Sequence, residues 1–257
     1  MPDNVSLFQI QKKISSRSFL RWASCVTAPL GVIAFWGGMW MASRRFPAGY
    51  DWRYMPVSHL LTPSRDPEGH LWATGGIVLC SLFGVCWTAV LAERWNLERV
   101  GGRPSGIKAL QLGNFWLMCS AALPEWLLRV HKGHEIFAVL AFACLCIGMV
   151  LLMFQTIERA FMCGMRKSTG RARLYAATLA STSIFPILLA GLAQAYVHYV
   201  LPELHWPSLS PVYLNFPFWE WVTCAMLSVY MTIISLATYT VYPTREAGEK
   251  NLGDTQQ

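Results

Sequence analysis

The chain has 257 residues, of which 54% are hydrophobic and only 14% charged. This ratio excludes an ordinary soluble domain of this size and predicts a membrane protein. The formal net charge is +7, but no run of Lys and Arg stands in a soluble fold that could present it, which excludes a nucleic-acid-binding protein.

Six apolar stretches are each long enough to cross about 30 Å of hydrocarbon as a helix. Polar connections separate them, and they cover residues 20–42, 71–92, 108–128, 135–158, 174–201 and 217–241. The first stretch follows a basic segment but is too long for a cleaved signal, so we expect it to be retained. Asn114 and Glu125 interrupt the third stretch and Pro186 should kink the fifth, which indicates a protein-lined interior.

These stretches predict an all-α, polytopic membrane protein with six transmembrane helices in a bundle. Residues 1–243 are expected to form a single membrane domain. The polar residues 244–257 are expected to form a disordered cytoplasmic tail.

The Lys and Arg residues of the connections set the predicted orientation. Fifteen of them lie in the two tails and in the second and fourth loops, whereas six lie in the first and third loops. By the positive-inside rule, the side with fifteen, which includes the N- and C-termini, is cytoplasmic. The main exception to this bias is a set of four arginines in the first loop, Arg44, Arg45, Arg53 and Arg65.

With this orientation, all six histidines and several carboxylates gather at the extracytoplasmic ends of the helices. Ionisable side chains at the membrane edge cost free energy unless they are paired or hydrated, so Glu125 and Glu220 are functional candidates. The segment from Val57 to His70 is polar and contains prolines, which favours a lid or cap over the helices. The predicted binding residues are Ser58, Glu68, His70, Glu125, His131, His134 and Glu220.

Two kinds of chemistry are open to these residues. As a nucleophile, Ser58 would pair with His70, His131 or His134 rather than with His59, because adjacent residues rarely face each other. Otherwise Ser58 is a turn-forming or capping serine. His131 and His134 are three apart at a helix start and would share a face, where a carboxylate would complete a zinc site. Otherwise both are hydrated interfacial histidines, and no other cofactor is predicted.

Several short motifs together resemble the Frag1/DRAM/Sfk1 family of six-helix membrane proteins. The resemblance covers most of the chain and rests on Pro56-Val57-Ser58, on Pro67-Glu68, on His134 in HEIFAVLAF and on Glu220-Trp221 in FWEWVTCAMLSVYMTII. The chain departs from the family pattern at Leu61, where a glycine is common, and in the additional His59 and His70. The resemblance implies lipid-related work on the extracytoplasmic side or a regulatory role in the membrane.

The leading hypothesis is therefore an extracytoplasmic pocket that recognises a polar lipid headgroup while the helices hold its acyl chains. Hydrogen bonding to the headgroup is preferred to acid–base chemistry on an ester, in which His134 would be the base and Glu220 would orient it. A non-enzymatic scaffold or regulator of a membrane protein partner is the second hypothesis, and a metal-dependent membrane hydrolase is the third. Transport is disfavoured because only Pro186 breaks a helix.

Overall fold

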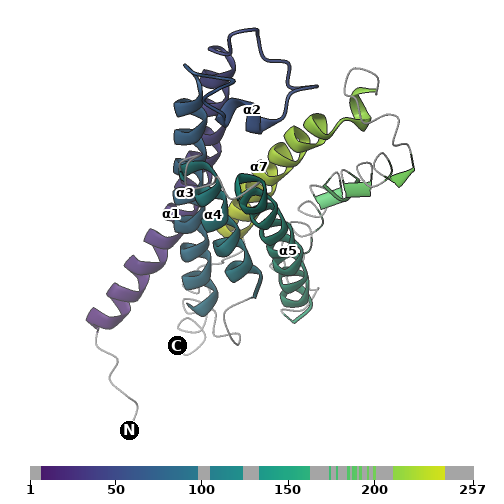
Figure 1. The fold of residues 1–257 in the computed structure, drawn as a ribbon. Helices are drawn as coiled ribbons and strands as arrows, with labels where there is room; N and C mark the ends of the chain where they lie inside the picture. The colour runs from purple at the N-terminus through teal and green to yellow at the C-terminus, as the bar shows by residue number, and fades with distance from the viewer. Residues whose placement is uncertain are drawn as a thin grey trace, which may run out of the picture.

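A computed structural model describes residues 7–97, 105–123, 133–162 and 211–240, together with scattered positions between 174 and 200. Within these ranges, side chains are described for 22–93, 105–123, 136–158 and 211–235. The secondary structure of this part of the chain is helical (Figure 1), with the elements α1 Leu7–Ser43, α2 Val57–Leu61, α3 His70–Leu97, α4 Ser105–Ala122, α5 Gly133–Met162, η3 Val212–Leu214 and α7 Phe216–Thr240.

Four of these helices contain a segment that is long and apolar enough to cross a membrane. The segments are Trp22–Ser43, His70–Glu93, Ile136–Glu158 and Phe216–Ser235. They identify the chain as a membrane protein, and they coincide closely with the first, second, fourth and sixth predicted stretches. An apolar run of about 20 residues folds into a helix in hydrocarbon because only a helix satisfies all of its own backbone groups.

The other two predicted spans are placed less completely. The third stretch forms the helix α4, which has 18 residues and ends at Ala122, so that Glu125 lies outside the described residues. Asn114 is buried in α4, donates its side-chain N–H to the Leu110 carbonyl over 2.8 Å and packs against Gly84 of α3, as a protein-lined interior requires. The fifth stretch, with Pro186, and the tail 244–257 lie outside the described residues apart from scattered helical positions.

Glycines allow two pairs of helices to approach closely. In the pair of α1 and α3, a Cβ atom added to Gly38 would lie 2.6 Å from the Trp72 carbonyl oxygen and 2.7 Å from the Gly76 Cα. In the pair of α4 and α5, a Cβ atom added to Gly106 would lie 2.6 Å from the Leu152 nitrogen. Close backbone approach at small residues is a main source of helix association in lipid, where the hydrophobic effect between helices is absent.

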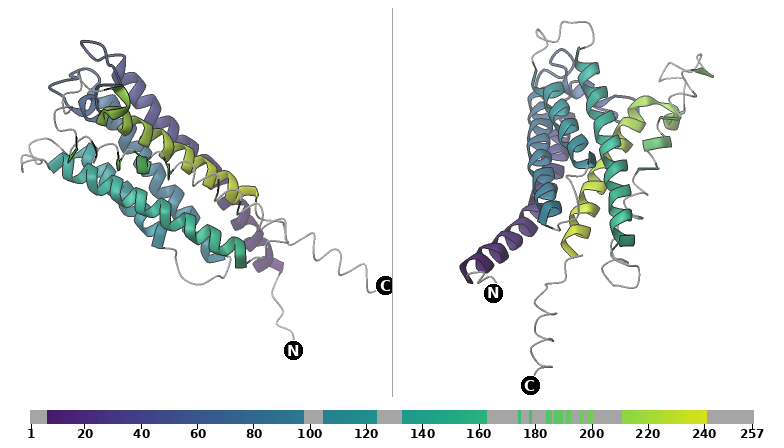
Figure 2. Two further views of the ribbon diagram at one scale, coloured as in Figure 1. Left: turned by 90° about the vertical axis from the view of Figure 1, so that its right-hand side faces the viewer. Right: turned by 90° about the horizontal axis from the view of Figure 1, so that it is seen from below.

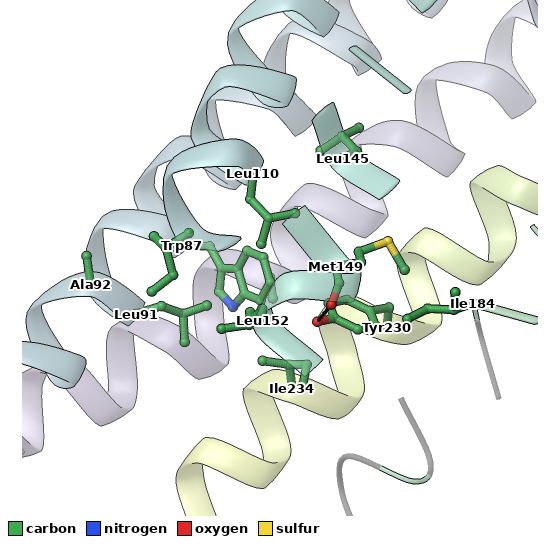
Figure 3. Close-up of a cluster of buried hydrophobic side chains, with 12 residues drawn as sticks. Trp87, Leu91, Ala92, Leu110, Leu145, Met149, Leu152, Ile184, Tyr230 and Ile234 are labelled. Carbon is green, nitrogen blue, oxygen red and sulfur yellow. Dashed lines mark hydrogen bonds between the residues drawn. The ribbon is translucent and has the colours of Figure 1, made fainter. Parts of the chain in front are cut away.

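Hydrogen bonds between side chains and other helices hold α7 against these two pairs. The Tyr230 hydroxyl donates to the Met149 carbonyl of α5 over 2.9 Å, inside the buried apolar cluster of Figure 3. The indole N–H of Trp87, on α3, donates to the Ser235 hydroxyl of α7 over 2.7 Å. Trp36 of α1 donates in the same way to Ser228, over 3.1 Å. Each bond satisfies a polar atom that hydrocarbon could not.

Several helix ends lie together at one end of the molecule. Figures 1 and 2 show the segment between α1 and α3, the end of α4 and the starts of α5 and α7 at one end. We call residues 44–69, which join α1 to α3 and contain α2, the first loop. This arrangement brings the first loop beside the start of α7, although the loop ends at residue 69 and α7 begins at Phe216.

Candidate functional site

The first loop is attached to α7 through the carboxylate of Glu220. The backbone N–H of Val57 donates to Glu220 Oε2 over 2.8 Å. Val57 is the first residue of α2, and the preceding Pro56 offers no side-chain cap to that N–H group. The free N–H groups of a helix start need an acceptor, and here the acceptor comes from a distant helix. Glu220 therefore fixes the position of α2.

Trp221, the next residue of α7, holds the loop at a second point. Its indole N–H donates to the Tyr50 hydroxyl over 3.1 Å and lies 3.3 Å from the Met55 carbonyl oxygen. The Tyr50 hydroxyl itself donates to that carbonyl over 2.7 Å. Burial raises the pKa of the Tyr50 phenol, so the hydroxyl stays protonated and keeps donating near neutral pH. The Trp221 indole, the Tyr50 hydroxyl and the Met55 carbonyl therefore form one hydrogen-bonded cluster between the loop and α7.

Aromatic rings surround this cluster. The Trp221 ring lies 5.8 Å from the ring of Trp36 on α1 and 6.0 Å from that of Tyr50. Trp52 of the loop stacks on Phe218, one turn earlier on α7, with 5.9 Å between ring centroids. Such ring pairs add about 0.5–1.5 kcal/mol each to the burial of their surface. The start of α7 thus presents a largely aromatic face to the first loop, with one carboxylate in it.

The other end of the loop is fixed by Asp66, which caps α3. Its Oδ1 accepts the Gly69 N–H over 2.9 Å, and its carbonyl accepts the His70 N–H over 3.0 Å. Asp66, with Pro67 after it, opens the turn that leads into α3, and its side chain satisfies an N–H of that turn as an N-cap residue would. The side chain is fully buried, which raises its pKa, while the Gly69 N–H opposes that shift. A Cβ atom at Gly69 would overlap the Asp66 carboxylate, which would have to move to make room for it.

Three of the four arginines of the loop have different partners. Arg53 pairs with Asp51 over 2.9 Å and holds the pKa of that carboxyl below its ordinary value. The guanidinium of Arg45 lies 5.1 Å above the Trp72 ring and donates to the Met41 carbonyl over 3.2 Å.

Arg65 contacts the ring nitrogen Nε2 of His59. Burial, and then the charge of Arg65, lowers the pKa of His59. The imidazole is therefore neutral at pH 7 and accepts the hydrogen bond from the guanidinium.

The structure places four of the predicted binding residues at this end. Ser58 is half-buried in α2, directly after the residue that Glu220 holds, and its carbonyl accepts the Thr62 hydroxyl over 2.7 Å. Glu68 is exposed in the turn before α3. His70 directs Nδ1 to the carbonyl oxygens of Asp66 and Pro67, at 3.0 and 3.1 Å. The described contacts of His70 are thus with the α3 cap.

The side chains of the remaining candidates are not among those that the structure describes. Glu125 and His131 lie outside the described residues, and His134 is in the first turn of α5. The pairing of His134 with Ser58 or Glu220 and the zinc site of His131 and His134 therefore stay predictions. Among the residues that the structure describes, no three His, Cys, Asp or Glu side chains form a group that could hold a metal ion.

Sequence reasoning missed the positioning roles of Tyr50, Trp221 and Asp66. The order Asp66-Pro67-Glu68 is a sequence signal for a helix start and would have identified the cap. No such local signal exists for Tyr50 and Trp221, because 171 residues separate them. Their contact depends on how α7 packs against the first loop.

Comparison of the chain with protein-family models, with curated proteins and with solved structures finds no match in any of the three. The resemblance to the Frag1/DRAM/Sfk1 family therefore rests on the short motifs around Ser58, Glu68, His134 and Glu220. Three of these four residues lie in the first loop or at the α7 start that holds it.

Proposed function

We propose that the chain is a six-helix, multi-pass membrane protein of the Frag1/DRAM/Sfk1 type that binds a polar membrane lipid at its extracytoplasmic end. In this proposal α4 and the 174–201 segment complete the bundle, and both termini are cytoplasmic. The headgroup would lie against the first loop and the acyl chains along the apolar helices. Four helices that are long and apolar enough to cross a membrane support the membrane part.

The proposal of lipid binding rests on the composition of the first loop and of the residues around it. Hydrogen bonds to Glu220 and Trp221 hold the loop in place. Exposed aromatic side chains lie in the loop and directly after it, with Trp52 and Trp72 each 47% exposed. Trp and Tyr are typical of the headgroup level of a membrane. A fixed polar loop at that depth is suited to bind a headgroup.

The position of Glu220 favours binding over catalysis. One oxygen of its carboxylate is used by the backbone of the loop, so its described contact is structural. A general base or its orienter needs a free path to a reacting group or to the base. We therefore propose that Glu220 positions the loop and that Ser58, Glu68 and His70 offer polar groups to the headgroup.

Lipid binding can be tested on purified, delipidated protein by native mass spectrometry during titration with a mixture of phosphatidylcholine, phosphatidylethanolamine and phosphatidylglycerol. We expect the wild type to retain lipid, and Glu220→Ala to weaken retention by at least about tenfold because the loop loses its attachment. Val139→Ala, on the 66% exposed outer face of α5, is the control and should behave as the wild type. Equal retention by all three proteins would contradict a specific site.

Orientation needs a separate experiment. A single cysteine at the exposed Ser64, in a background without the eight native cysteines, should react with a membrane-impermeant maleimide in intact cells. Labelling only after permeabilisation would place the first loop in the cytoplasm and reverse the proposed topology.

A further inference from the structure

Three of the four arginines in the first loop form no ion pair with a carboxylate among the described residues, although the charge of Arg45 acts to lower the pKa of Asp66. Only Arg53 forms an ion pair, with Asp51. Arg65 donates to the neutral ring of His59, and Arg45 donates to a carbonyl and lies over an aromatic ring. The side chain of Arg44 is exposed.

The carboxylates nearest to Arg65 in sequence do not neutralise it. Asp66 is fully buried, and its carboxylate points into the α3 start, where it accepts the Gly69 N–H. Glu68 is exposed, and it forms no ion pair with a described residue. A guanidinium has its strongest hydrogen bonds with anionic oxygens. The contact of the Arg65 guanidinium with an imidazole nitrogen therefore leaves most of its N–H donors available for an anionic ligand.

In the proposed orientation these cations would lie at the depth of lipid phosphates. Trp52 of the loop and Trp72, which supports Arg45, are both exposed aromatic residues, and such residues mark the headgroup region. In the proposed orientation, the arginines also oppose the positive-inside bias. An anionic partner on that side would offset this unfavourable placement.

We propose that the first loop binds the phosphate group of an anionic glycerophospholipid through Arg65, with His59 beside it. On binding, Arg65 exchanges its hydrogen bond with His59 Nε2 for hydrogen bonds with two phosphate oxygens. The planar fork of the guanidinium matches that pair of oxygens. This inference rests on the proposed lipid-binding function and names its ligand class.

The test compares two arginines of the same loop that differ in their partners. Delipidated full-length protein is titrated with phosphatidylglycerol and, separately, with phosphatidylcholine, and bound lipid is counted by native mass spectrometry. The wild type should bind phosphatidylglycerol at least about tenfold more tightly. Arg65→Gln should lose most of that preference, and Arg65→Lys, which keeps the charge without the fork, should lose part of it. Arg53→Gln removes the same charge from a guanidinium already bound to Asp51, and should retain the preference.

Each other outcome has a definite meaning. Equal affinity of the wild type for the two lipids would overturn the inference while leaving the proposed lipid binding intact. An equal loss in Arg65→Gln and Arg53→Gln would show a general effect of net charge and would also overturn it. Displacement of phosphatidylglycerol by millimolar inorganic phosphate would identify free phosphate, not lipid, as the ligand. Failure to bind either lipid would contradict the proposed function itself.

Discussion

The carboxylate of Glu220 accepts a hydrogen bond from the backbone N–H of Val57 over 2.8 Å, across 163 residues of the chain. Glu220 lies inside an apolar helix that is able to cross a membrane, where an ionisable side chain costs free energy unless it has a partner. Its partner is the start of α2. Glu220, whose placement in an apolar helix costs free energy, thus holds the loop that carries the polar and cationic side chains of the candidate site.

Removal of that carboxylate should loosen the loop. Glu220→Ala leaves the Val57 N–H without its acceptor, which should lower the free energy of unfolding by about 1–3 kcal/mol. Glu220→Gln keeps an oxygen acceptor and should cost less. Thermal unfolding in detergent measures both, and Glu158→Ala, an exposed glutamate of α5, is the control. Unchanged stability in Glu220→Ala would contradict the positioning role.

The contact between Trp221 and Tyr50 should behave as one unit. Trp221→Phe removes the indole N–H and keeps a ring, and Tyr50→Phe removes the hydroxyl that bonds to Met55. Each change should cost about 1 kcal/mol. Because the two groups share a hydrogen bond, the double variant should cost less than the sum. Strict additivity in thermal unfolding would show that the two side chains do not interact.

Neighbouring glycines of α1 should respond in opposite ways to alanine. Gly38→Ala places a Cβ atom against the backbone of Trp72 and Gly76, whereas Gly37→Ala meets no atom within 4 Å. Overpacking should destabilise the Gly38 variant by about 1–3 kcal/mol. The Gly37 variant should be neutral or slightly more stable, since alanine favours the helix by up to about 1 kcal/mol. Similar unfolding temperatures for the two variants would contradict the close approach of α1 and α3.

The α3 cap predicts a coupling between Asp66 and Gly69. Asp66→Ala should cost about 1 kcal/mol through loss of the N-cap. Gly69→Ala should be harmful in the wild type because its Cβ atom would overlap the Asp66 carboxylate. In the Asp66→Ala background, where that carboxylate is absent, the same change should cost less. The four unfolding measurements form a double-mutant cycle, and a coupling energy near zero would argue against this geometry.

The stability of the loop should fall in mild acid because of His59. Burial and Arg65 keep the pKa of this side chain below its ordinary value of 6.5, so below pH 6.5 the unfolded chain binds more protons than the folded one. The neutral His59 side chain makes its full contribution to the free energy of unfolding above pH 6.5. That contribution is lost as the pH falls through the pKa of His59 in the folded protein. The wild type should therefore lose stability relative to His59→Gln between pH 7.5 and pH 5, by less than about 1 kcal/mol because solvent screens the site.

The pH comparison is made by thermal unfolding of both proteins at the two pH values. The other histidines are common to both proteins, so their effects cancel in the difference. Arg65→Gln removes the second cause of the shift and should weaken the effect. A pH-independent difference between wild type and His59→Gln would exclude the proposed titration.

The sequence alone determined the four helices that are long and apolar enough to cross a membrane. The stretches predicted at 71–92 and 135–158 match the helical segments His70–Glu93 and Ile136–Glu158 within one residue at each end. This is possible because the thickness of the hydrocarbon fixes the length of an apolar run, which is a local property of the chain. Glu220 stood out for the same reason, as a charged residue in such a run.

Only the tertiary structure decided which groups these residues contact. It brought Glu220 to the Val57 backbone and Trp221 to Tyr50, and it gave Arg53 a carboxylate partner but Arg65 an imidazole. Directional contacts between distant segments depend on how helices pack, here through backbone contacts such as that of Gly38 with Gly76. Hydrophobic periodicity does not encode that packing, because in lipid the faces that contact protein and those that contact lipid are both apolar.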